Sequence, residues 1–113
     1  DPAIAAALAR RPMPRDEAGV GAVRCAVSPT RRGLSLRATL ELPGGGGDVQ
    51  TVIETADPQV WVAEPDARWH DGDLVTEAEM RHLDGGAFAL DRSRVRITVL
   101  RKGQAIDVLG CTG

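Results

Sequence analysis

The sequence has 113 residues, a length that suits one domain with one hydrophobic core. Hydrophobic residues make up 42% of it and charged residues 27%, which excludes wholesale disorder, and the net charge of −2 gives no general attraction to nucleic acid or to an anionic membrane. The three aromatic residues, Trp61, Trp69 and Phe88, are too few for a platform that stacks bases or sugars. The longest apolar run, residues 3–9, is too short to span a membrane.

The first residues have the pattern of a short helix. Asp1 can cap its amino end, Pro2 suits its first turn, and the alanines that follow are strong helix formers. Pro12 stops the helix. We therefore expect a helix and linker over residues 1–19 and a single β-rich domain over residues 20–113.

From residue 23 onward, apolar and polar residues alternate with the period of half-buried strands. The first strand is expected over 23–27 and the clearest over 34–42. Four glycines at 44–47 are read as a flexible hairpin tip, with 48–56 as the returning strand. Leu36, Leu40, Val95, Ile97 and Val99 occupy the apolar phase of the two best strands, and we expect them in the core.

The second half contains further strand signals and one helix signal. Residues 60–62 lie between two prolines and are expected to form an edge strand. Thr76 and Glu79 match a capping box, which predicts a helix of about two turns ending at Gly85. The remaining strands are expected over 87–90, 94–99 and 105–111.

Together these elements predict a mainly β fold, either a small antiparallel β-sandwich or an α+β domain with one or two short helices. No predicted helix is long enough for the crossover that parallel strands require.

The two cysteines, Cys25 and Cys111, fall in the first and last predicted strands. They show neither a Cys-x-x-Cys spacing nor a zinc pattern. A disulfide is the favoured interpretation, and two buried free thiols are the alternative. A disulfide, together with a chain that starts at Asp1, leads us to expect a secreted or periplasmic protein. A domain excised from a larger assembly is equally consistent with that start.

The sequence contains no motif that defines a catalytic, cofactor or metal site. The glycine run lacks the Gly-Lys-Ser/Thr ending of a phosphate loop, and the segment 69–73 lacks the spacing of a calcium loop. We therefore expect no cofactor and no metal. The alternative hypothesis is a small hydrolase or metal-dependent enzyme. Its centre would be formed by His70, Asp71, Asp73 and His82.

Charge is segregated along the chain, with −7 over residues 54–84 and +5 over residues 92–102. Local pairing of these charges is one explanation, and a bipolar docking surface is the other. We expect a non-enzymatic protein-interaction module, such as an inhibitor, an assembly factor or an accessory domain of an exported bacterial-type protein. Its partner would be another protein and not a nucleic acid. The candidate interaction residues are Trp61, Trp69, Asp71, Asp73, Arg94 and Arg96.

Overall fold

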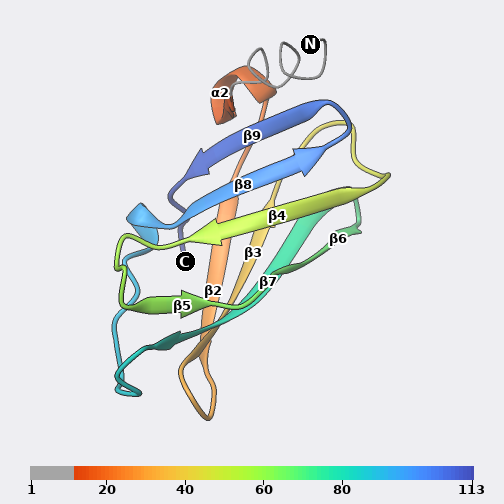
Figure 1. Ribbon diagram of the computed structural model, residues 1–113. Helices are drawn as coiled ribbons and strands as arrows, with labels where there is room; N and C mark the ends of the chain where they lie inside the picture. The colour runs from red at the N-terminus through yellow and green to blue at the C-terminus, as the bar shows by residue number, and fades with distance from the viewer. Residues whose placement is uncertain (1–11) are drawn as a thin grey trace, which may run out of the picture.

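The computed structural model describes residues 12–113, which form two β-sheets packed face to face (Figure 1). The helix expected before Pro12 lies outside these residues. One sheet has the strand order β1-β9-β8-β4, and the other has the order β2-β3-β7-β5, with β6 also paired to β7. The strands are β1 (Met13–Pro14), β2 (Val23–Pro29), β3 (Leu34–Leu40), β4 (Val49–Glu54), β5 (Val60–Val62), β6 (Asp66–His70), β7 (Asp73–His82), β8 (Arg96–Arg101) and β9 (Gln104–Leu109).

The predicted fold class is confirmed, because the described chain is mainly β and its sheets are largely antiparallel. Its helical content is the four-residue helix α2 (Arg15–Ala18) and the 3₁₀ turn η1 (Arg92–Arg94). Within residues 12–113, no helix has the length and hydropathy to cross a membrane.

The core lies between the two sheets and is filled by the inward-facing side chains of β2, β3, β7, β8 and β9. The five residues expected there are confirmed, with exposures of 0 to 1%. The largest buried side chains include Leu36, Leu40, Leu74, Met80, Ile97, Ile106 and Val99. Alternation in the sequence was a reliable guide because each strand has one face in this core and one face in solvent.

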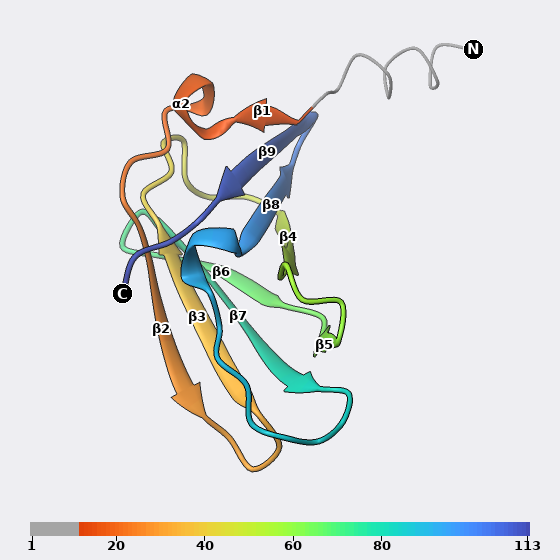
Figure 2. The same ribbon diagram turned by 90° about the vertical axis from the view of Figure 1, so that its left-hand side faces the viewer.

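The segment before β2, expected to be a linker, is ordered against the domain. Met13 and Pro14 pair in parallel with Ile106 and Asp107 of β9, and Ala18 packs against the core. This short pairing covers part of the outer edge of β9 (Figure 2).

The helix predicted from Thr76 is wrong, since these residues lie in β7, the longest strand of the domain. The hydroxyl of Thr76 does not cap a helix but points into the core, where it shares a 2.6 Å hydrogen bond with the hydroxyl of Thr51. The inward positions of β7 include a threonine and an alanine, so the apolar alternation was weak in the sequence. Packing between β3 on one side and β5 and β6 on the other overrides the local helix signal.

Two other expectations fail through long-range pairing. Residues 48–56 do contain a strand, but β4 pairs with β8 in the opposite sheet and does not return along β3. Residues 87–90 form no strand, although Phe88 and Leu90 still pack against the core. The expected strand at 60–62 is confirmed as β5, which pairs with β7 on one side only.

The segment around Asp71 and Gly72 is a tight hairpin between β6 and β7. His70 pairs with Asp73, so the turn contains only two residues, and both have positive φ, 51° at Asp71 and 84° at Gly72. Those angles belong to a type I′ turn, for which Asp-Gly is a preferred pair.

Candidate functional site

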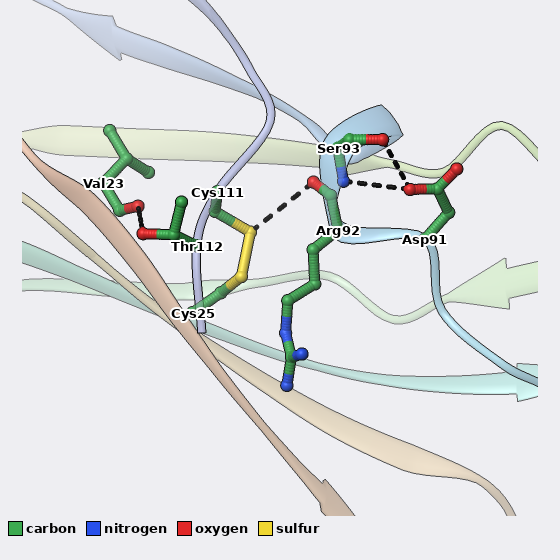
Figure 3. Close-up of a disulfide and its surroundings, with 7 residues drawn as sticks. All are labelled: Val23, Cys25, Asp91, Arg92, Ser93, Cys111 and Thr112. Carbon is green, nitrogen blue, oxygen red and sulfur yellow. Dashed lines mark hydrogen bonds between the residues drawn. A yellow bond between two sulfur atoms is a disulfide. The ribbon is translucent and has the colours of Figure 1, made fainter.

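The two sheets meet along two sides of the sandwich, here called its seams. One seam is closed by the C-terminal segment. Cys25 of β2 and Cys111 are joined by a disulfide with an S–S distance of 2.07 Å, and both residues are buried (Figure 3). The Thr112 amide donates to the Val23 carbonyl at 3.0 Å, and the Cys25 amide donates to the Thr112 carbonyl at 2.8 Å. The last residues thus form a short bridge to the beginning of β2 and cover its outer edge there (Figure 2).

The residues around the disulfide are held by the 3₁₀ turn. Asp91 accepts hydrogen bonds from the amide and hydroxyl of Ser93 at 3.1 and 2.6 Å (Figure 3). The Arg92 carbonyl lies 3.8 Å from the Cys111 sulfur, a packing contact because a disulfide sulfur carries no hydrogen. It also accepts from the Cys111 amide at 3.1 Å.

The opposite seam is open along β4. This strand pairs with β8 on one side, and no hydrogen bond from its backbone to a further strand exists within residues 12–113. Alternate residues of an edge strand present free N–H and C=O groups. Figure 1 shows β4 at the margin of its sheet, next to β5 of the other sheet.

The sequence of β4 lacks the features that usually protect an edge. It reads Val-Gln-Thr-Val-Ile-Glu, with no proline, no lysine and a single charge at its end. The other edges are interrupted or partly covered by a short segment. The β5–β6 edge is broken between Val62 and Asp66, where Pro65 lies, and the C-terminal segment pairs with the first residues of β2, Val23–Cys25, before β2 ends at Pro29. β4 is therefore the most accessible strand for added pairing.

A groove of about 520 Å³ runs along this edge. Residues 49–53 of β4 line one wall, and residues 62–67 line the other. Val49, Ile53, Val62 and Ala67 give the groove an apolar floor. Val52 and Leu100, which also line the groove, are 43% and 37% exposed.

Acidic side chains stand at the far rim of the groove. Glu64 and Asp66 are both exposed, and the nearest basic group to Asp66 is Arg68 at 3.7 Å. A long basic side chain lying in the groove could reach both carboxylates.

Arg68 is engaged mainly elsewhere, on the solvent face of the second sheet. It donates to Glu77 at 2.9 Å, and Arg37 of β3 donates to the same oxygen at 2.8 Å. The hydrogen bond from Arg68 is the main reason that the pKa of Glu77 is lowered; burial opposes this effect, and the charge and hydrogen bond of Arg37 add to it. This outer face is a self-paired charged surface.

The six candidate interaction residues do not form one surface. Trp69 is half-buried against the core, and its indole N–H donates to the Gly47 carbonyl at 3.0 Å, so the glycine run folds over this ring. Asp71 and Asp73 lie at the hairpin next to it. Trp61 lies at the far end of β7, opposite Arg81, and is 47% exposed.

The two candidate arginines have local roles. Arg96 lies across from Glu54 and forms an ion pair with Asp107 of β9, and that hydrogen bond raises the pKa of Arg96. Arg94 lines a small cavity of about 180 Å³ together with Asp57 and Phe88. Within residues 12–113, no salt bridge joins the acidic stretch 54–84 to the basic stretch 92–102.

The residues of the alternative enzymatic centre are divided between the two ends of β7. His70, Asp71 and Asp73 lie at its start, with 3.3 Å between His70 Nε2 and Asp71 Oδ2. His82 lies at its end, about 30 Å away along an extended strand. There its ring is flanked by Asp84 at 2.8 Å and Asp57 at 3.8 Å. The described residues contain no group of three or more ligand-type side chains placed to hold a metal.

The Asp84 carboxylate is held in place on two sides. The Gly86 amide donates to it at 2.7 Å and is the main reason that the pKa of Asp84 is lowered, with the neighbouring His82 adding to the effect. This arrangement fixes the turn after β7.

Comparisons with protein-family models, with curated proteins and with solved structures find no match for this chain. The open edge at β4 was not among the sequence-predicted sites. A signal for it was present, because residues 49–54, within the strand predicted over 48–56, combine high β propensity with no proline and one charged residue. Sequence alone placed it inside a hairpin, which would have hidden that edge.

Proposed function

We propose that this domain is a non-enzymatic protein-interaction module that binds an extended segment of a partner protein as an additional strand on β4. The observation that carries the proposal is the unprotected edge of β4 beside an apolar groove. In strand addition, main-chain hydrogen bonds supply affinity and alternate side chains supply specificity. An inhibitor, an assembly factor or an accessory domain could use such a contact.

The groove indicates the chemistry of the bound segment. Every second side chain of an added strand would point toward Val49, Ile53 and Val62, so these positions should be apolar. At least one lysine or arginine should reach Glu64 and Asp66 at the rim. The expected partner is therefore an extended segment with alternating apolar residues and a basic residue among them.

The experiment is a selection of random linear peptides on the immobilised wild-type domain, followed by affinity measurement. Selected peptides should share the alternating apolar and basic pattern. Methylation of single backbone nitrogens should abolish binding at alternate positions and have little effect at the positions between, because only one edge of the added strand bonds to β4. A peptide that tolerates methylation at every position would contradict strand addition.

Two variants of the protein test whether the peptide binds at the edge of β4. Val52→Lys puts a charge beside the edge and should weaken binding, whereas Leu109→Lys changes an exposed residue on the same sheet face away from the groove and should not. A wild-type dimer that Val52→Lys converts to a monomer would show that the occupant is a second copy, which would overturn the proposed heterologous partner.

We also infer that the protein works in an oxidising compartment, secreted or periplasmic, with the buried disulfide as support. Expression with export to an oxidising compartment should yield more folded protein than expression in a reducing cytosol. Equal yields of equally stable, fully reduced protein would contradict this assignment.

A further inference from the structure

Three arginines gather at the end of the sandwich opposite the Asp71 hairpin. Arg31 and Arg32 come from the turn between β2 and β3, and Arg81 comes from the end of β7. They line one hollow of about 320 Å³, together with His82, Leu83 and Gly85. This hollow shares no lining residue with the groove along β4 and does not depend on the function proposed for it.

The turn that carries Arg31 and Arg32 is fixed against β7. Its ends are joined by hydrogen bonds from the Thr30 amide to the Gly33 carbonyl at 2.9 Å and from the Gly33 amide to the Thr30 hydroxyl at 3.1 Å. A β-carbon on Gly33 would lie 2.1 Å from the Met80 carbonyl oxygen, so only glycine permits this approach. The two arginines are thereby held beside the end of β7.

Arg81 is positioned from its other side by Trp61, its cross-strand neighbour. The guanidinium carbon lies 4.7 Å from the centre of the indole ring. Stacking uses the flat face of the guanidinium and leaves its in-plane N–H groups available for a ligand.

The positive charge of this hollow is not neutralised by the surrounding protein. None of the three arginines forms a salt bridge within residues 12–113. The carboxylate of Asp84, between the lining residues Leu83 and Gly85, already interacts with the Gly86 amide and with His82.

We propose that this hollow, the arginine site, binds a small multivalent oxyanion, namely a phosphate or sulfate group that is either free or part of a small ester. Guanidinium groups match the tetrahedral oxygens of such anions with paired N–H donors. A small ligand fits the volume of about 320 Å³ better than an extended polyanion, and Asp84, between the lining residues Leu83 and Gly85, would repel an anionic chain that extends past it.

The test is a titration followed by amide NMR at constant ionic strength, with inorganic phosphate, inorganic sulfate, O-phosphoserine and a sulfated disaccharide as separate probes and chloride as the reference. Saturable shifts should be confined to residues 30–33 and 81–86. The ranking of the four probes distinguishes a phosphate from a sulfate source, and a free ion from an ester.

Matched variants test the site itself. Arg31→Ala/Arg32→Ala and Arg24→Ala/Lys102→Ala each remove two exposed positive charges, but only the first pair lines the hollow. The first should weaken binding about tenfold or more, as expected for lost charge-assisted hydrogen bonds, and the second should have little effect. Trp61→Ala should weaken binding through Arg81 while leaving Arg31 and Arg32 in place.

Three results would overturn the proposal. The first is linear, unsaturated shifts spread over the surface. The second is equal weakening by both double variants, which would indicate net charge alone. The third is tighter, strongly salt-dependent binding of a long sulfated polysaccharide than of any small probe, which would make the site a polyanion surface.

Discussion

Leu40, the last residue of β3, is fully buried in the core. Replacing it with alanine should lower the free energy of unfolding by about 2 to 5 kcal/mol. The variant loses apolar contacts, and it also contains a cavity that the surrounding sheets do not fill. Leu83→Ala is the matched control, since Leu83 is 63% exposed and should change stability by less than about 0.5 kcal/mol. Chemical denaturation measures both, and similar losses in the two variants would contradict the assigned core.

The Glu77 carboxylate makes a contribution to the stability of the fold that depends on pH. Its pKa in the folded protein lies below the ordinary value of 4.5, chiefly because it accepts a hydrogen bond from Arg68. The stability that it contributes is therefore complete above about pH 4.5 and is lost as the pH falls through the lower folded pKa. Glu77→Gln should cost at most about 1 kcal/mol at pH 7, since the pair is at the surface.

The difference between wild type and Glu77→Gln should disappear in strong acid, where the wild-type carboxylate is protonated. Urea unfolding from pH 7 to pH 2 measures this difference. Glu79→Gln, on the same face of β7 but without a salt bridge in residues 12–113, should show no such closing gap. A constant gap for Glu77→Gln at every pH would mean that the interactions with Arg37 and Arg68 contribute nothing.

At the level of single residues, burial was predicted wherever apolar side chains alternate with polar ones. Burial was not predicted where a polar side chain occupies an inward-facing position. Thr76 is polar yet fully buried, because Thr51 of the other sheet satisfies its hydroxyl. That partner is 25 positions away, and local sequence cannot reveal it.

Among the elements, the β6–β7 hairpin depends most clearly on two residues. Asp71 and Gly72 both adopt positive φ, which costs a residue with a β-carbon about 1 to 2 kcal/mol. Gly72→Ala should therefore reduce stability by about that amount. Asp71→Asn should be neutral or slightly stabilising, because asparagine accepts this conformation readily. Thermal unfolding compares the two variants.

If Gly72→Ala were as stable as wild type, the two-residue turn would be wrong. The turn pair itself was readable in the sequence, since Asp-Gly between two strands is a strong hairpin signal. The capping-box match at Thr76 and Glu79 competes with this signal, because it predicts a helix where the second strand of the hairpin lies.

Strand identity was easier to predict than strand pairing. The strands at 23–29, 34–40 and 96–101 follow from alternation, and so does their inward face. The partner of β4 does not, because the loop with four glycines allows the chain either to fold back on β3 or to cross to the other sheet. The open edge, and with it the candidate site, follows from that crossing and so could not be placed from sequence.

On the scale of the whole molecule, the two seams of the sandwich are unequal. One is closed by the disulfide and the C-terminal bridge to β2, and the other is left open at β4. A covalent link on the closed side can hold the sheets together without any strand crossing the open side. The domain can therefore keep an accessible edge while remaining a single folded unit.

The disulfide should accordingly be a large contributor to stability. It joins residues 86 positions apart, and the loss of loop-closure entropy in the unfolded chain predicts about 4 to 5 kcal/mol. Cys25→Ala/Cys111→Ala should lose roughly this amount in denaturant titrations while the β-sheet circular dichroism signal is retained. In this variant, hydrogen exchange should accelerate most at the amides of residues 25 and 112, because their hydrogen bonds are no longer held in place by the disulfide. It should accelerate least along β3. Counting thiols in the oxidised wild type under denaturing conditions should find no free thiol.

Two free thiols in that measurement, or a double variant as stable as wild type, would show that hydrogen bonding and packing alone close this seam.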